Sequence, residues 1–391
     1  IRERSRKNAL AKFLPSLDAS ATQGLKNQVS GGTAESIYGV VGLTLTETLY
    51  DNGQNFWSYK AAVLAEEKAQ IDLEKARAQL TLSLSQEFYR YSQFTRLGEL
   101  QKQRLDVLTR QLRTVEGQYR QGMRTRRDYL RFKTQVQRAE ISLLAAVNNR
   151  HSSRTEMMRI LGAPPEQIVD PGEPAEFTFI PVPEARAPEA IPEDSPALGR
   201  HYEARLKAVT EKANEIAVKL AFRDYLPRAT LAGTMDWASG STTPGATAGP
   251  YQGGQALNWN VSLGLTYNIW DWGILRRDWA KAERTRDQGN LTLLGTLQEV
   301  SATIRKLMLK LGQLKRNLEL SRELLGYEEE SYESLNADYK QGRVAYLDLI
   351  TALDSLFSAR SSYADAYFSV QSAVAEYHYH RGDLYESINQ E

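Results

Sequence analysis

The chain has 391 residues, of which 41% are hydrophobic, enough for two or three globular domains. Its formal net charge is only +1, with both signs mixed along the chain, which argues against nucleic acid as a partner. It has no cysteine, which excludes disulfides, thiolate chemistry and zinc–cysteine sites, and it has no run of 18 apolar residues that would predict a transmembrane helix.

The first expected elements are two strands, in which apolar and polar residues alternate as on a sheet with two different faces. No proline lies between Ser16 and Ala163, so a long uninterrupted helix can follow them. In that helix the apolar period becomes seven, the spacing of a coiled coil, at Leu84, Tyr91, Gly98, Leu105, Leu112 and Tyr119. The first repeat, 1–162, therefore has strands at about 13–24 and 38–51 and a helical hairpin over 53–162 with its tip at 119–128.

A proline-rich segment over 163–195 is expected to be a linker that wraps around the helices as a strap. Nine of the 13 prolines fall within 164–196, which is incompatible with regular helix. The second repeat, 196–391, is expected to have a helix over 196–224, strands at about 226–238 and 257–271, and a helical hairpin over 273–382 with its tip at 339–348.

The second set of elements is a copy of the first at a constant offset of 220 residues. YRQG, which begins at Tyr119, recurs as YKQG from Tyr339, and Asp51 aligns with Asp271. A register kept over about 120 residues is typical of a tandem repeat. The sequence therefore predicts a mainly α protein with a small β part, built as a tandem strand-strand-long-helix repeat. Because twelve residues precede FLP, against about thirty before YLP in the second copy, we expect an N-terminal stretch, after a cleaved signal peptide, to be missing.

Strands of about ten residues are long enough to cross a membrane when tilted, but four strands cannot close a barrel. Open strand edges are not tolerated in lipid, because their backbone groups would have no partner there. If the strands cross a membrane, three chains would share one 12-stranded barrel. An ordinary half-buried hairpin explains the alternation equally well. Tryptophans near the strand ends would suit the membrane interfaces: Trp57, Trp237, Trp259, Trp270 and Trp272.

These features together resemble the TolC-like outer-membrane efflux protein family. The resemblance lies in the LP-containing first strand of each copy, the second strand ending in LYDNG or IWDWG, the long helix, and the tip motif Tyr-x-x-Gly with Asp six residues later. It implies a homotrimer whose twelve-stranded β-barrel lies in outer-membrane lipid of a Gram-negative bacterium and continues as an α-helical coiled-coil tunnel through the periplasm. It also implies a passive exit duct of a tripartite efflux pump or type I secretion system. A periplasmic adaptor (membrane fusion) protein and, through it, an inner-membrane transporter would be its partners.

The resemblance assigns gate residues at the periplasmic tips. Asp348 matches a pore-constricting acidic position, Asp128 is its counterpart on the first tip, and Tyr339 matches a tyrosine that helps to hold the closed state. Two positions depart from the family pattern: Val344 stands where arginine is expected, and Thr351 where a second acid is expected. The closing ion pair must therefore use another base or be absent.

Adaptor docking is expected at the two tip turns, of which the first is basic. Arg343 and Arg124 are also the candidates for the missing base, by proximity. The tip and docking residues are Tyr119, Gly122, Arg124, Arg126, Arg127, Arg131, Gly342, Arg343 and Val344.

Each of these assignments has an ordinary structural alternative. Asp128 and Asp348 could be helix-start carboxylates favoured by the helix dipole, and charged tips are common on solvated hairpins. His378 and His380 are two residues apart and do not share a helical face, so no metal site is expected. No Ser/His/Asp constellation, phosphate-binding loop or dinucleotide turn occurs, so we expect neither an enzyme nor a cofactor. The alternative from another class is a soluble coiled-coil scaffold whose strands form a small cap.

Overall fold

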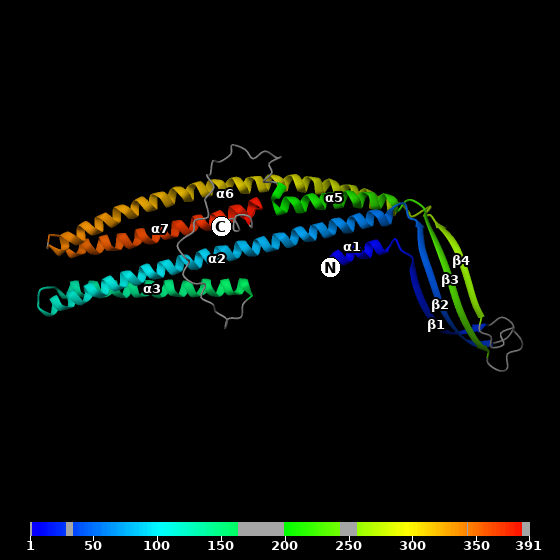
Figure 1. The fold of residues 1–391 in the computed structure, drawn as a ribbon, viewed down its shortest axis with the longest axis horizontal. Helices are drawn as coiled ribbons and strands as arrows, with labels where there is room; N and C mark the ends of the chain where they lie inside the picture. The colour runs from blue at the N-terminus through cyan, green and yellow to red at the C-terminus, as the bar shows by residue number, and fades with distance from the viewer. Residues whose placement is uncertain (1, 29–33, 163–198, 243–255, 342, 385–391) are drawn as a thin grey trace. The chain divides into compact units, whose positions relative to one another are not determined.

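The computed structural model describes residues 2–28, 34–162, 199–242, 256–341 and 343–384. The expected strap over 163–195 and Gly342 lie outside the described residues. The fold is mainly helical with one small sheet (Figure 1). In chain order the elements are α1 (Arg2–Ala11), β1 (Ser16–Gln28), β2 (Ala34–Tyr50), α2 (Gln54–Arg120), α3 (Arg126–Leu161), α5 (Tyr202–Arg223), β3 (Arg228–Thr242), β4 (Ala256–Thr266), α6 (Ile274–Lys340) and α7 (Tyr346–Arg381).

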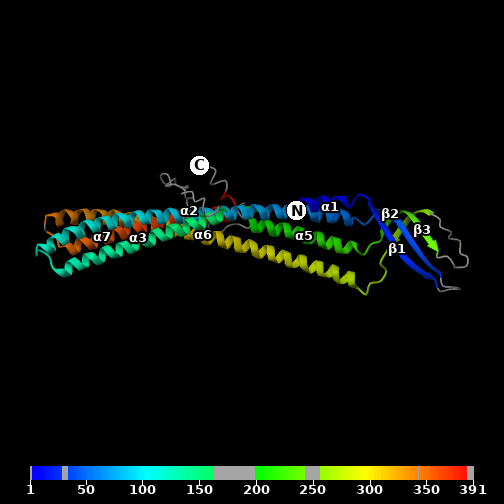
Figure 2. The same ribbon diagram turned by 90° about the horizontal axis from the view of Figure 1, so that it is seen from below.

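The chain divides into two compact units. The strand unit comprises residues 1–72 and 206–295, and the helical unit comprises residues 73–205 and 296–391. Figures 1 and 2 show α2, α3, α6 and α7 as long helices that run alongside one another in the helical unit. Among the described residues, no helix combines the length and the apolar character needed to cross a membrane.

Helices that correspond to one another at the 220-residue offset have equal lengths. Both α2 and α6 contain 67 residues, and both α3 and α7 contain 36. α3 and α7 each end at a glycine with positive φ, 68° at Gly162 and 79° at Gly382, where a residue without a side chain is least strained.

The sheet is antiparallel with strand order β1-β2-β3-β4, and β1 and β4 are its edges. Its register aligns apolar residues across all four strands, so that Ala19 lies opposite Leu43, Leu43 opposite Met235 and Met235 opposite Trp259. In the single chain these side chains are exposed, by 45% at Leu43 and 77% at Trp259. The neighbouring row runs from Ser20 through Gly42 and Asp236 to Asn258 and is polar. One face of the sheet is therefore an exposed apolar surface.

Each repeat passes from strand to helix through the same turn. The carboxylate of Asp51 accepts hydrogen bonds from the N–H groups of Gly53 at 2.9 Å and Asn55 at 2.7 Å. Asp271 accepts the matching pair, at 2.9 and 2.8 Å. These bonds satisfy donors at the helix start, which have no partner within the helix. The residue after each aspartate has positive φ, which asparagine tolerates and Trp272, at 56°, adopts under strain.

The fourth strand ends earlier than the alternation predicts. A strand was expected over about 257–271, but β4 ends at Thr266. Thr266 pairs with Arg228, the first residue of β3, and Pro227 before it has no N–H to extend the ladder. β2 runs on to Tyr50 because a bulge lets Tyr50 pair with Ala229. The other strands also shift by a few residues: β1 begins and ends later than expected, and β2 and β3 extend farther into the loops.

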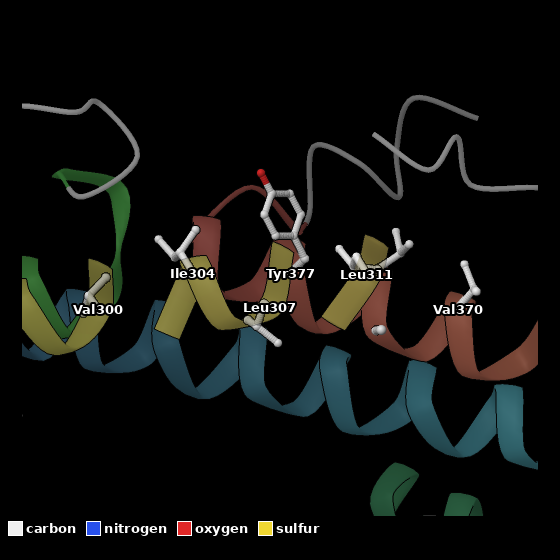
Figure 3. Close-up of a cluster of buried hydrophobic side chains, with 8 residues drawn as sticks. Val300, Ile304, Leu307, Leu311, Val370 and Tyr377 are labelled. Atoms are coloured by element: carbon white, nitrogen blue, oxygen red, sulfur yellow. The ribbon is translucent and has the colours of Figure 1, made fainter. Parts of the chain in front are cut away.

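Apolar clusters that include residues of α7 hold the described part of the helical unit together. One of them joins α6 to α7, with Val370 1% and Leu311 2% exposed (Figure 3). A second cluster joins Leu100 and Leu108 of α2 and residues of α3 to Leu353 and Phe357 of α7. Of the heptad positions predicted for α2, Tyr91 is 4% exposed, and Leu105 and Leu112 pack against the second cluster, as expected for the apolar stripe of a coiled coil.

Helix α5 begins at Tyr202, where a helix was expected from 196; residues 196–198 lie outside the described part. The Nδ1 atom of His201 accepts a hydrogen bond from the N–H of Glu203 at 3.2 Å, so the ring caps the helix. The ring also stacks on His380 of α7, with His201 Nε2 3.4 Å from His380 Nδ1. Burial, followed by the nearby His380, lowers the pKa of His201 to about 4.

We expect Leu311→Ala to lower the free energy of unfolding by about 2–5 kcal/mol, because it leaves a cavity in the α6/α7 cluster. Denaturant unfolding followed by circular dichroism measures the change. Gln313→Ala, at an exposed position on the same helix, is the control and should change it by less than about 0.5 kcal/mol. Equal effects of the two changes would contradict the packing described for Leu311.

The neutral state of His201 predicts a loss of stability on acidification. The unfolded chain takes up a proton near the ordinary histidine pKa of 6.5, whereas folded His201 resists it until about pH 4. Stability is therefore complete above pH 6.5 and falls as the pH drops from 6.5 toward 4. His201→Asn retains a capping oxygen and cannot titrate, so its unfolding midpoint should depend less on pH in this window. His151→Asn, at an exposed histidine, is the control; an unchanged pH slope in His201→Asn would refute the assignment.

Candidate functional site

The first tip is a tight turn closed by its own backbone. Gly122 has φ 78° and donates its N–H to the carbonyl of Tyr119 at 3.0 Å, while Met123 donates to the carbonyl of Gln118 at 2.9 Å. The ring of Tyr119 stacks on that of Tyr129 with 5.5 Å between centroids and 9° between planes. These contacts join the end of α2 to the start of α3. They also explain the Tyr-x-x-Gly motif, because only glycine adopts this φ without strain.

The second tip repeats the backbone turn with different side chains. Arg343 donates its N–H to the carbonyl of Asp338 at 3.0 Å, and its Nη1 lies 3.4 Å from the Asp338 carboxylate. Its Nη2 donates to Gln341. Val344 and Tyr339 are partly exposed. The two arginines proposed as the missing base thus bond within their own tips, since Arg124 donates to Gln118 at 3.2 Å.

The two tip aspartates lie at equivalent positions but in different environments. Asp128 accepts a hydrogen bond from the hydroxyl of Thr125 at 2.7 Å, and Thr125 in turn accepts from the N–H of Asp128 at 3.2 Å. This reciprocal cap, with the Thr125 hydroxyl as the main cause, lowers the pKa of Asp128. Asp348 is in the first turn of α7, whose N-cap residue, Ala345, has no hydroxyl to offer. Asp128 therefore has a structural role, whereas the carboxylate of Asp348 is exposed.

Thr351, expected near the gate, is turned toward its own helix. Its hydroxyl donates to the carbonyl of Leu347 at 2.9 Å, although the residue as a whole is exposed. A bond of this kind within the helix leaves the hydroxyl oxygen able to accept, but it adds no charge beside Asp348.

A groove of about 910 Å³ lies against the first tip and the start of α7. We call it the tip groove. Its apolar part comes from both hairpins, and its rim carries five arginines and one aspartate. Its lining residues are Val115, Arg124, Arg126, Arg127, Asp128, Leu130, Arg131, Phe132, Thr134, Gln135, Arg138, Ala345, Leu347 and Ile350.

The tip groove brings together the basic docking residues expected from the sequence but not the whole predicted site. Arg124, Arg126, Arg127 and Arg131 all line it, together with Asp128. The remaining tip residues are not in its lining: Tyr119, Tyr339, Arg343, Val344, Asp348 and Thr351. Of the predicted gate residues, Asp128 therefore lines the basic groove, whereas Asp348, Thr351 and Tyr339 lie outside its lining.

Sequence reasoning missed the contribution of the second hairpin to this groove. Leu347 is 58% exposed, and Ile350 packs against Val115 and Phe132 of the first hairpin. Arg138, one heptad after Arg131, could have been found from the spacing, but the contact with α7 could not. A groove lined by apolar side chains and five arginines is suited to an acidic, amphipathic segment of another protein.

The histidines near the end of α7 bind different partners. His378 Nδ1 lies 2.9 Å from the carboxylate of Asp383, and His380 stacks on His201. In the described part of the chain, no group of three or more histidine, aspartate or glutamate residues is arranged to hold a metal ion. The candidate functional site is therefore the pair of tips with their charged side chains.

Comparisons with solved structures show where this fold occurs. The Campylobacter jejuni CmeC outer membrane channel is 15% identical with a TM-score of 0.82, over 100% of this chain and 83% of that chain. The outer membrane protein VceC of Vibrio cholerae is 16% identical with a TM-score of 0.79, over 97% and 90%. The Neisseria gonorrhoeae MtrE outer membrane channel, in its open state, is 17% identical with a TM-score of 0.76, over 98% and 84%. At these identities the likeness establishes the fold.

A comparison with curated protein sequences gives no match. The sequence does match the family model described as "Outer membrane efflux protein" over residues 2–163 and 197–376. This match covers most of both repeats and confirms the resemblance seen in the strand, turn and tip motifs. The chain therefore belongs to the outer membrane efflux protein family.

Proposed function

We propose that this protein is the outer-membrane exit duct of a tripartite efflux pump or of a type I secretion system. In this proposal it is a passive homotrimeric channel that crosses the outer membrane and the periplasm and is gated at its helical tips. The observation that carries the proposal is a four-stranded sheet with an apolar exposed face and two edge strands, in a chain of the outer membrane efflux protein family.

The sheet supports a shared barrel. Its apolar face would be costly in water but is favourable against lipid tails. β1 and β4 leave backbone donors and acceptors unpaired at the two edges, and these need partners in a membrane. Pairing β4 of one copy with β1 of the next closes a twelve-stranded barrel from three copies. The tandem repeat then gives each copy two helical hairpins, 53–162 and 273–382, which would form the periplasmic tunnel wall.

The tips support two separate roles. Asp348, exposed and uncapped by a side chain, is the better placed carboxylate for a ring that constricts the pore. Thr351 and Tyr339 lie near it in sequence and complete the proposed gate, while the carboxylate of Asp128 accepts a hydrogen bond from Thr125, the residue that caps α3. The tip groove, with Arg124, Arg126 and Arg127, would dock a periplasmic adaptor that links the duct to an inner-membrane transporter. Energy would come from that transporter.

The proposal is tested with the purified protein in detergent and in planar lipid bilayers. Channel activity and a trimer that survives SDS without heating are expected. A water-soluble monomer without conductance would refute the duct and favour the coiled-coil scaffold.

In the same bilayers, Asp348→Ala should raise single-channel conductance or weaken block by multivalent cations, because it removes one carboxylate per chain from the constriction. Asp128→Ala is the matched control, since its carboxylate is engaged by Thr125. The assignment fails if Asp348→Ala behaves as the wild type, or if Asp128→Ala produces the larger change.

We further expect reversal of the groove's charge to weaken adaptor docking. The chain has no cysteine, so Leu347→Cys supplies a single thiol in the tip groove for cross-linking to a periplasmic protein in cells. Adding Arg126→Glu and Arg127→Glu should reduce the cross-linked product about tenfold, because an acidic partner would meet like charge. Lys133→Glu, on α3 outside the groove lining, should leave the yield unchanged. Equal yields from all variants would show that the arginines do not dock the partner.

A further inference from the structure

One ion pair joins the two hairpins of the chain within the helical unit. Arg104 of α2, in the first hairpin, donates from Nη2 to the carboxylate of Asp354 of α7, in the second hairpin, at 2.6 Å. A second polar contact between the same two helices lies farther from the tips, where Gln93 donates to Asp365 at 2.8 Å. The neighbouring ribbons of α2 and α7 can be followed in Figure 1.

Arg104 lies between two buried leucines on the face of α2 that packs on α7. Leu100 and Leu108, one turn before it and one turn after it, are 2% and 0% exposed and belong to the cluster that packs on α7. Leu353, beside Asp354, is 1% exposed. Residues four apart share a helical face, so the arginine interrupts an apolar seam between the hairpins.

The environment makes this pair stronger than an ordinary surface ion pair. The side chains of Arg104 and Asp354 are only 20% and 33% exposed. The Nε atom of Arg104 is buried and has no hydrogen-bond partner among the described residues. The carboxylate of Asp354 is therefore the main group that balances the positive charge of Arg104. Removing one member of a pair in such surroundings leaves a poorly solvated charge, which costs more than the loss of an exposed pair.

Two other ion pairs of the helical unit lie within the second hairpin. Arg360 binds Glu329 at 2.9 Å and Lys310 binds Glu376 at 3.0 Å, and both pairs join α7 to α6. These pairs would survive if the two hairpins moved apart, whereas the pair of Arg104 and Asp354 would have to break.

We infer that Arg104 and Asp354 form a latch that holds the two hairpins of each chain together and so stabilises the closed tip. The inference rests on the proposed function, in which the hairpins move apart to open the duct. Arg104 lies about four turns before the end of α2 and Asp354 about two turns after the start of α7, so the latch is separate from both the tip groove and Asp348. The ion pair then contributes part of the free-energy difference between the closed and the open tip, from a position between α2 and α7.

The test uses the full-length protein in planar bilayers with Arg104→Gln, Asp354→Asn and the exchange Arg104→Asp/Asp354→Arg. Each single change should raise the ratio of open to closed channel at least about fivefold, since about 1 kcal/mol corresponds to this factor. The exchange restores opposite charges and should return the ratio toward the wild-type value. Lys310→Gln breaks a pair within one hairpin and should leave the ratio unchanged.

A second measurement follows the hairpins without requiring conductance. Met123→Cys and Leu347→Cys place spin labels on the exposed tips of the two hairpins, in a chain without other cysteines, and labelled chains are diluted with unlabelled ones. Arg104→Gln should lengthen or broaden the distance between the labels, and the exchange should reverse this.

The outcomes separate the latch from the duct. If the wild type conducts and the single changes alter neither the open ratio nor the label distance, the latch is refuted and the duct stands. If the wild type does not conduct but Arg104→Gln still separates the tips, the duct is refuted and the contact between hairpins stands. Failure of the exchange to reverse the effect of the single changes, with helical content unchanged by circular dichroism, would also overturn the latch.

Discussion

Burial of α7 is the constraint on which the helical unit depends. Three apolar clusters among the described residues of this unit include residues of α7: Val370 and Val374 against α6, Leu353 and Phe357 against α2 and α3, and Ile350 against the first tip. A helix that is apolar around so much of its circumference must be covered on several sides, because water would otherwise contact that surface. The first hairpin therefore packs against the second through α7, and the tip groove forms where this packing ends.

The sheet shows the opposite situation, since its apolar face is left uncovered in one chain. Leu43, Met235 and Trp259 form an exposed row in register across β2, β3 and β4. Neither this face nor the edge strands β1 and β4 are satisfied within the chain. A lipid environment and neighbouring copies would satisfy both at once, which is why the proposed trimer and the proposed membrane location depend on each other. In the helical unit, by contrast, the buried side chains of α7 pack against α2, α3 and α6 of the same chain.

The two tips share one backbone turn but carry different side chains. Backbone bonds to Gln118 and Asp338 close them in the same way, so the turn itself is common to both. The side chains then differ: Thr125 caps α3 and engages Asp128, whereas Ala345 leaves the start of α7 without a side-chain cap. The basic rim belongs to the first tip, and the exposed carboxylate of Asp348 to the second. This division is consistent with docking at one hairpin and constriction at the other.

The sequence by itself determined the kinds and lengths of the elements, because these depend on local rules. Alternation predicts the strands, and heptads and the lack of proline predict the helices. The tip arginines were also found from the sequence, since they lie within one short segment. The tertiary structure decided what depends on partners distant along the chain. β4 ends at Thr266 because Pro227, just before the neighbouring strand β3, cannot donate, and α5 begins where the His201 ring caps it. Packing of α7 places the two hairpins side by side. Only for this reason does Leu347 line one groove together with the arginines, and only for this reason does Arg104 contact Asp354, 250 residues away in the sequence.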